Sequence, residues 1–154
     1  MKINYLTLYP EMFPSFLGYA VTGRALEQGL WSYNAVNIRD FATDNYKTVD
    51  DTPFGGGAGQ VMKADVVDAA IRATYTKGAL IYMTPRGKPL TQSDVVRLSK
   101  QEELTILSGR FEGIDERVIE SWDFEQISVG DYVLSGGEPA ALVLTDAVLR
   151  YVPG

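Results

Sequence analysis

The sequence contains no cysteine and no histidine among its 154 residues. The first absence excludes disulfide bonds, cysteine nucleophiles and zinc sites built on thiolates. The second excludes Ser–His catalysis, an imidazole general base and any metal site that depends on histidine ligands. Acid–base chemistry therefore has to come from Asp, Glu, Lys or Tyr side chains, or from a group on the substrate.

Long hydrophobic runs are absent as well. The first ten residues hold too short an apolar run for a signal peptide, and no stretch reaches the length of a membrane-spanning helix. With 45% hydrophobic residues, a chain of this length can bury a core without disulfides or metals. We therefore predict a single cytoplasmic domain with no membrane partner.

Positive charge is scarce and unevenly placed. The chain carries 14 Lys and Arg against 20 Asp and Glu, a formal net charge of -6. Residues 1–100 hold 11 basic and 9 acidic side chains, whereas residues 101–154 hold 3 basic and 11 acidic ones. Because nucleic-acid binding relies on many Lys and Arg contacts to phosphates, this balance argues against a large nucleic-acid surface here.

Segments typical of strands and helices alternate along the chain. Apolar, β-forming runs bounded by Gly or Pro predict strands, and apolar residues at helical spacing predict helices. Local signals agree: Gly29 is typical of a left-handed helix cap, and Thr91 followed by Asp94 is a helix start signal. The predicted strands cover 3–9, 34–41, 78–83, 104–107 and 124–129; the predicted helices cover 22–28, 65–75, 91–98, 115–121 and 140–151. This alternation predicts an α/β fold, with a mainly parallel sheet flanked by helices.

Three glycine-containing segments, 84–89, 108–117 and 130–138, each follow a predicted strand. Ligands of open α/β sheets bind at the carboxyl ends of the strands, and glycines there let the backbone approach a ligand closely. We therefore interpret the three segments as loops that together form a ligand pocket.

The common phosphate-binding motifs are missing. Pro89 follows Gly87 and Lys88 where a P-loop requires Ser or Thr, and the glycines at 55–59 lack the spacing of a dinucleotide-binding loop. A ligand held by the backbone of several loops, such as an adenosyl group without phosphates, fits the pattern better.

Four segments are specific enough to indicate a family. They are 7–13 (TLYPEMF), 51–59 (DTPFGGGAG), 109–117 (GRFEGIDER) and 130–138 (GDYVLSGGE). In this order they closely resemble the bacterial tRNA (guanine-N1)-methyltransferases, which methylate the guanosine immediately 3′ of the anticodon. The resemblance spans essentially the whole chain. It implies that residues 1–154 form an S-adenosylmethionine-binding domain of the SPOUT class, whose C-terminal part is threaded into a deep trefoil knot.

The resemblance also implies site residues. Arg150 matches the family arginine that stabilises the target base during transfer, and Glu112 matches a glutamate beside the donor and the guanine. The implied donor site comprises Tyr82, Thr84 and Pro85 in the first loop, Gly109, Glu112 and Gly113 in the second, Val129, Gly130, Asp131, Tyr132, Val133, Leu134, Gly136 and Gly137 in the third, and Ala140.

The residues alone allow other interpretations of some of these positions. Without the resemblance, Arg150 is more typical of a solvated cation near a helix C-terminus, and residues 132–134 are typical of a plain core, which is compatible with an apolar adenine wall. This chain also departs from the family pattern, since Thr84 stands where Ser is more common and Pro139 is shifted by one position. The resemblance also implies that the glycine-rich residues 55–59, which on composition alone are typical of a flexible loop, lie near the target base.

Members of this family continue into a helical C-terminal domain that supplies tRNA-binding surface and a catalytic Asp. The resemblance therefore predicts that the chain is the donor-binding part of a longer homodimeric enzyme whose partner is tRNA, with magnesium as a possible requirement of that enzyme. No metal-ligand pattern is evident in this segment. Two further hypotheses remain open: a module that binds S-adenosylmethionine without turnover, and an unrelated, unknotted α/β protein that binds phosphate or flavin.

Overall fold

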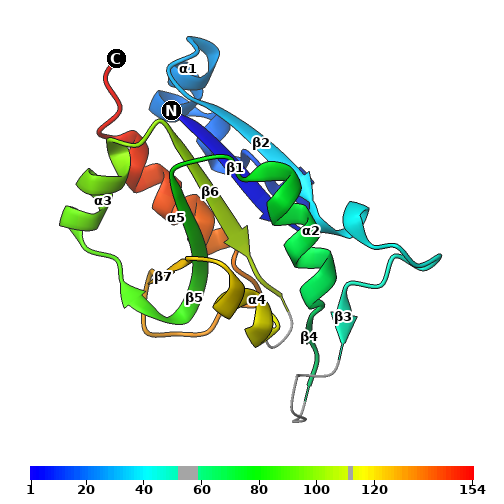
Figure 1. Ribbon diagram of the computed structural model, residues 1–154. Helices are drawn as coiled ribbons and strands as arrows, with labels where there is room; N and C mark the ends of the chain where they lie inside the picture. The colour runs from blue at the N-terminus through cyan, green and yellow to red at the C-terminus, as the bar shows by residue number, and fades with distance from the viewer. Residues whose placement is uncertain (52–58, 111–112) are drawn as a thin grey trace.

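The structure, a computed structural model, describes residues 1–51, 59–110 and 113–154. Within these ranges strands and helices alternate along the chain (Figure 1). The elements are β1 (Lys2–Thr7), the 3-10 helices η1 (Pro10–Met12) and η2 (Ser15–Gly18), α1 (Ala20–Glu27), β2 (Ser32–Asn37), the 3-10 helix η3 (Ile38–Phe41), β3 (Asp50–Asp51), β4 (Val61–Met62), α2 (Ala64–Thr74), β5 (Ala79–Pro89), α3 (Gln92–Ser99), β6 (Glu103–Ser108), α4 (Glu116–Ser121), β7 (Glu125–Ser128) and α5 (Glu138–Leu149).

The main sheet has the strand order β2-β1-β6-β5-β7, and every pairing in it is parallel. The two inner pairings of β6 join segments that are far apart in sequence, since Lys2 lies opposite Glu103 and Ala79 lies opposite Leu104. Parallel pairing brings the carboxyl ends of all these strands to one edge, the lower edge in Figure 1. The predicted α/β class with a mainly parallel sheet is thus confirmed, while the trefoil knot stays a prediction.

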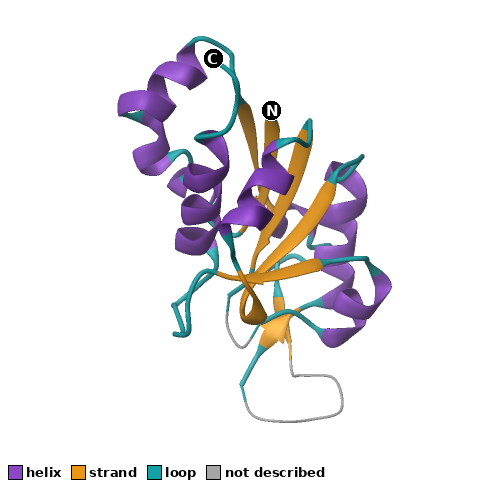
Figure 2. Cartoon of the chain, turned by 90° about the vertical axis from the view of Figure 1, so that its left-hand side faces the viewer, coloured by secondary structure: helices purple, strands orange, loops and turns teal. Residues whose placement is uncertain are grey.

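Helices cover both faces of the sheet (Figure 2). On one face, Ile3 and Tyr5 of β1 belong to a core that includes residues of α3 and α5. On the other face, Leu6 of the same strand belongs to a second core, built with α2 and α4. This alternation along one strand follows from the two-residue period of side chains in a β-strand.

The predicted helix signals are confirmed. The Thr91 hydroxyl accepts a hydrogen bond from the Asp94 amide, and the Asp94 side chain accepts one from the Thr91 amide, so α3 begins with a capping box. Gly29 follows Gln28, the C-cap residue of α1, and has a φ of +75°, as expected for a left-handed cap. No described helix is long and apolar enough to cross a membrane.

Some predicted boundaries are wrong. The predicted strand 34–41 is divided: β2 ends at Asn37, whose side chain caps the 3-10 helix η3 by accepting from the Arg39 amide at 3.0 Å. The predicted strand 3–9 ends at Thr7, because Pro10 opens η1. Helix α5 begins at Glu138, two residues before the predicted start, because Pro139 is tolerated in a first turn that needs no amide donor there.

Candidate functional site

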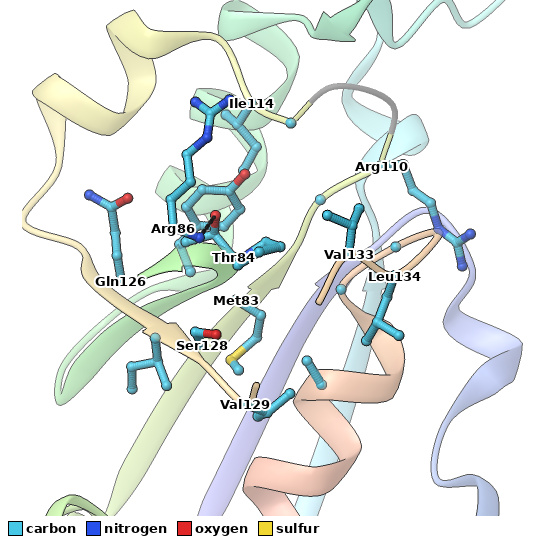
Figure 3. A pocket seen from close by; sticks show the side chains of 18 of the residues that line it. Met83, Thr84, Arg86, Arg110, Ile114, Gln126, Ser128, Val129, Val133 and Leu134 are labelled. Carbon is cyan, nitrogen blue, oxygen red and sulfur yellow. Dashed lines mark hydrogen bonds between the residues drawn. The ribbon is translucent and has the colours of Figure 1, made fainter. Parts of the chain in front are cut away.

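A pocket of about 430 Å³ opens at the carboxyl edge of the sheet. Residues of three segments line it: the second half of β5 and the two loops that follow β6 and β7 (Figure 3). Among the described donor-site candidates, every residue named above lines the pocket except Asp131, which is exposed and outside the lining. Glu112 and residues 52–58 lie outside the described residues. The geometry therefore brings together nearly all the residues that the motifs had indicated, and the binding role of these residues stays a prediction.

The first segment is not the simple loop that was predicted. Strand β5 continues through 84–89, with a register shift against β7 between Met83 and Lys88. The chain runs so close to β7 that a Cβ on Gly87 would lie 2.5 Å from the backbone nitrogen of Ile127. This packing leaves residues 84–86 on the wall of the pocket.

The second segment is packed around one tyrosine ring. Tyr82 is buried, and burial raises the pKa of its hydroxyl. A Cβ on Gly109 would lie 3.3 Å from the ring and a Cβ on Gly113 would lie 3.2 Å from the hydroxyl oxygen, so both glycines allow the loop to touch Tyr82. Gly113 also has a φ of +115°, which an L side chain rarely adopts.

The third segment presents apolar side chains to the solvent beside the pocket. Tyr132 is 55% exposed and Val133 is 84% exposed, so the interpretation of these residues as plain core is wrong. The Ser128 hydroxyl donates to the Gly130 carbonyl at 2.7 Å and fixes the start of the segment. Exposed aromatic and aliphatic side chains at a pocket rim are typical of a site that binds a partly apolar ligand.

The second and third segments touch each other directly. The Gly137 amide donates to the Gly109 carbonyl at 3.0 Å, and a Cβ on Gly137 would lie 2.9 Å from the Ser108 Cα. Arg110 Nη2 forms an ion pair at 2.9 Å with Oε1 of the fully buried Glu138, the first residue of α5. The two loops thus form one continuous wall.

The motifs gave no separate role to several polar residues that line the pocket. Arg86, Arg110, Glu116 and Gln126 are all part of its lining. Arg86 and Arg110 lie inside the glycine-containing segments, so their positions in the sequence could have predicted that they line the pocket. Gln126 lies on β7 and carried no local signal, because only the pairing of β7 with β5 brings it there.

Arg150 is far from this pocket within the chain. It follows the last residue of α5, whereas Ala140, near the start of the same helix, lines the pocket. Ten residues of α-helix separate them by about 15 Å along the axis. Figure 1 accordingly shows the C-terminus at the end of the molecule opposite the pocket edge. No group of three or more metal-ligating side chains occurs within the described ranges.

The chemistry of the pocket suits an organic ligand with apolar and hydrogen-bonding parts. Its walls combine Val, Leu, Ile and Tyr side chains with the backbone of three loops. Fold and pocket together define an α/β protein with a pocket of small-molecule size at the carboxyl ends of parallel strands. Residues 1–154 match the family described as tRNA (Guanine-1)-methyltransferase TrmD. The chain therefore belongs to this family.

Individual relatives agree over nearly the whole chain. It is 59% identical to a tRNA (guanine-N(1)-)-methyltransferase of Rhodospirillum rubrum over 155 residues, which covers 100% of this chain and 65% of the relative. It is 56% identical to the protein of that name from Bartonella tribocorum over 153 residues, 99% of this chain and 66% of the relative. The chain thus spans about two thirds of the length of these relatives.

Proposed function

We propose that this chain supplies the methyl-donor site of an enzyme that methylates N1 of the guanosine 3′ of the anticodon in tRNA, with S-adenosylmethionine as donor. One observation carries the proposal: the two loops bearing the family motifs at 109–117 and 130–138 converge with the second half of β5 on one pocket, in a chain whose whole length matches the family. The names of the relatives support the same reaction. Because the substrate is tRNA, the proposal places the protein in the cytoplasm.

The pocket fits the donor in size and in kind. Its volume of about 430 Å³ lies in the ordinary range for small-molecule sites. An adenine ring needs an apolar slot edged by backbone donors and acceptors, and the third segment offers Tyr132, Val133 and Leu134 beside the backbone of Gly130 and Gly136. Thr84 lies across the pocket from Val133 and Leu134 (Figure 3), and Pro85 also lines the pocket.

The proposed reaction needs a site for the methyl donor, a group that stabilises negative charge and a proton acceptor, and this chain would supply the first two. When bound, S-adenosylmethionine supplies a methyl group on a sulfonium, ready for in-line displacement. The methyl–sulfur bond breaks as the bond to N1 forms, and the N1 proton has to pass to a base. Negative charge then develops on the guanine O6, which Arg150 would stabilise, while Glu112 would lie beside the donor and the guanine. The proton acceptor is the family aspartate of the C-terminal domain.

The position of Arg150 connects the reaction to a homodimer. Since about 15 Å of helix separates Arg150 from Ala140, this arginine does not reach the pocket of its own chain. Within the proposal, Arg150 acts on a base held at the pocket of a second subunit. A magnesium requirement would belong to the whole enzyme, because the described residues hold no cluster of ligands for it.

Binding of S-adenosylhomocysteine, the product form of the donor, tests the donor site. Calorimetry on the 154-residue chain is expected to give saturable binding that Tyr132→Ala weakens and Tyr46→Ala leaves unchanged. Tyr46 is a matched control because it is 90% exposed and lies outside the pocket lining. Stabilisation by FMN or phosphate, without any by S-adenosylhomocysteine, would favour the unrelated α/β protein instead.

Methyl transfer tests the reaction itself. The enzyme that contains this chain is expected to methylate a tRNA with guanosine 3′ of the anticodon, but not the same tRNA with adenosine there. Arg150→Ala should abolish transfer while leaving the affinity for S-adenosylhomocysteine intact. If the donor binds but no methyl group is transferred to the guanosine-bearing tRNA, the result would support the alternative of a module that binds S-adenosylmethionine without turnover.

A further inference from the structure

Glu138 is a carboxylate with no exposed surface at the first position of α5. A buried charge of this kind is unfavourable unless hydrogen bonds and an opposite charge compensate for the lost water. Oε2 accepts a hydrogen bond from the Thr7 hydroxyl at 2.7 Å, and Oε1 lies 2.9 Å from Arg110 Nη2. The helix N-terminus adds a favourable dipole. The carboxylate thus has one hydrogen bond, at Oε2, and one ion pair, at Oε1, which accepts no hydrogen bond from the described residues.

These partners come from separate parts of the chain. Thr7 ends β1, and its hydroxyl oxygen also accepts from the Tyr9 amide at 3.0 Å. Arg110 belongs to the loop after β6 and lines the pocket. The network thus joins the end of an inner strand, the second pocket loop and the helix that follows the third loop.

Arg110 extends the network into the third loop. Its Nη1 donates to the Ser135 carbonyl at 3.4 Å, and its guanidinium carbon lies 4.7 Å from the centre of the Tyr9 ring. A Cβ on Gly136 would lie 2.3 Å from Arg110 Nε, so the loop backbone runs directly against this side chain. Figure 3 shows Arg110 at the edge of the pocket, on the side away from Arg86 and Gln126.

We infer that Glu138 and Arg110 are a positioning pair, which fixes the second and third pocket loops against the end of β1 and so sets the width of the donor pocket. The ligand in this inference rests on the proposed function. Neither residue takes part in the chemical step. Glu138 acts through Arg110, and Arg110 acts through the backbone of residues 135–137.

Substitutions at the network test the pair, with a buried carboxylate elsewhere as control. Glu138→Gln keeps the shape and an acceptor for Thr7 but removes the charge that faces Arg110. Thr7→Val removes the other support, and Thr7→Ser restores the hydroxyl. The control is Glu103→Gln, which makes the same chemical change at a buried glutamate that accepts a hydrogen bond from Asn4 at 2.7 Å. Glu103 lies at the amino end of β6, about 16 Å from the pocket edge.

Two measurements separate the inference from the function on which it rests. Hydrogen exchange of the ligand-free chain should become faster at residues 109–110 and 129–137 in Glu138→Gln and Thr7→Val, and not in Glu103→Gln or Thr7→Ser. The affinity for S-adenosylhomocysteine should fall about tenfold in Thr7→Val, the loss expected from one hydrogen bond to a charged group, and by a similar factor in Glu138→Gln, which loses the ion pair with Arg110.

Each result has a distinct meaning. Unchanged exchange in the two loops of Glu138→Gln and Thr7→Val would overturn the positioning pair, whatever the ligand is. Altered exchange with wild-type affinity would also overturn it, because the pocket would then not depend on the pair. If the unmodified chain fails to bind S-adenosylhomocysteine, the proposed function fails, and the exchange data alone still decide whether Glu138 holds the loops.

Discussion

Replacement of Gly137 by alanine should damage the pocket more than its small size suggests. Gly137 has a φ of -83°, which alanine adopts freely, so the backbone itself does not oppose the change. The added methyl group would lie 2.9 Å from the Ser108 Cα and 3.1 Å from the Gly109 nitrogen. Carbon atoms normally pack at about 3.5–4.0 Å, so the two loops must separate by roughly 0.6–1 Å.

Moving the two loops apart in Gly137→Ala would weaken the direct contact between the second and third loops. It stretches the 3.0 Å hydrogen bond from the Gly137 amide to the Gly109 carbonyl. Overpacking of this kind costs about 1–3 kcal/mol of folding free energy. Since both loops line the pocket, we expect the affinity for S-adenosylhomocysteine to fall about tenfold, the equivalent of about 1.4 kcal/mol.

Calorimetry and urea denaturation measure the two effects, and Gly29→Ala is the matched control. Gly29 has a φ of +75° and open space around it, so alanine there should cost about 1 kcal/mol through backbone strain alone. Both variants should therefore lose stability, and only Gly137→Ala should lose donor affinity. The reasoning is refuted if Gly137→Ala binds as tightly as the unmodified chain, or if Gly29→Ala loses affinity to the same extent.

Three further predictions follow from packing and charge. Gly87→Ala should lower the melting temperature and the S-adenosylhomocysteine affinity together, because its Cβ would meet the β7 backbone 2.5 Å away; an unchanged affinity would contradict this. Leu144→Ala, in the fully buried part of α5, should cost about 2–5 kcal/mol in urea denaturation, and a loss below 1 kcal/mol would contradict the packing described. Hydrogen bonds from Thr91 lower the pKa of Asp94 to about 2. Its ionised form therefore stabilises the fold above about pH 4, and about 1–2 kcal/mol should be lost as the pH falls to 2. Acid titration of Asp94→Asn should lack this component, and an identical titration would contradict the assignment.

Local chemistry explains what could be predicted from the sequence. The Thr91–Asp94 capping box and the Gly29 cap depend only on residues within one turn, and both are confirmed. The glycine-containing segments after strands were sufficient to locate the pocket, because parallel strands bring their carboxyl ends to one edge.

What could not be predicted depends on contacts between distant segments. The continuation of β5 through 84–89 requires β7 as a partner, and no local pattern announces it. The ion pair of Arg110 with Glu138 joins residues that were both visible in motifs, but the burial of that pair is a property of the assembled sheet and helix. The strand order could not be predicted either, because it also depends on pairing between distant segments.

The place of β6 between β1 and β5 also constrains how the chain can be made in the cell. Lys2 pairs with Glu103 and Leu6 with Leu107, so the first strand emerges from the ribosome about a hundred residues before its inner neighbour. At 5–20 residues per second, β1 would wait roughly 5–20 s with one edge unpaired. The main sheet can therefore be completed only after β7 has been made, and until β6 is available the nascent chain carries an unpaired strand edge, which favours aggregation.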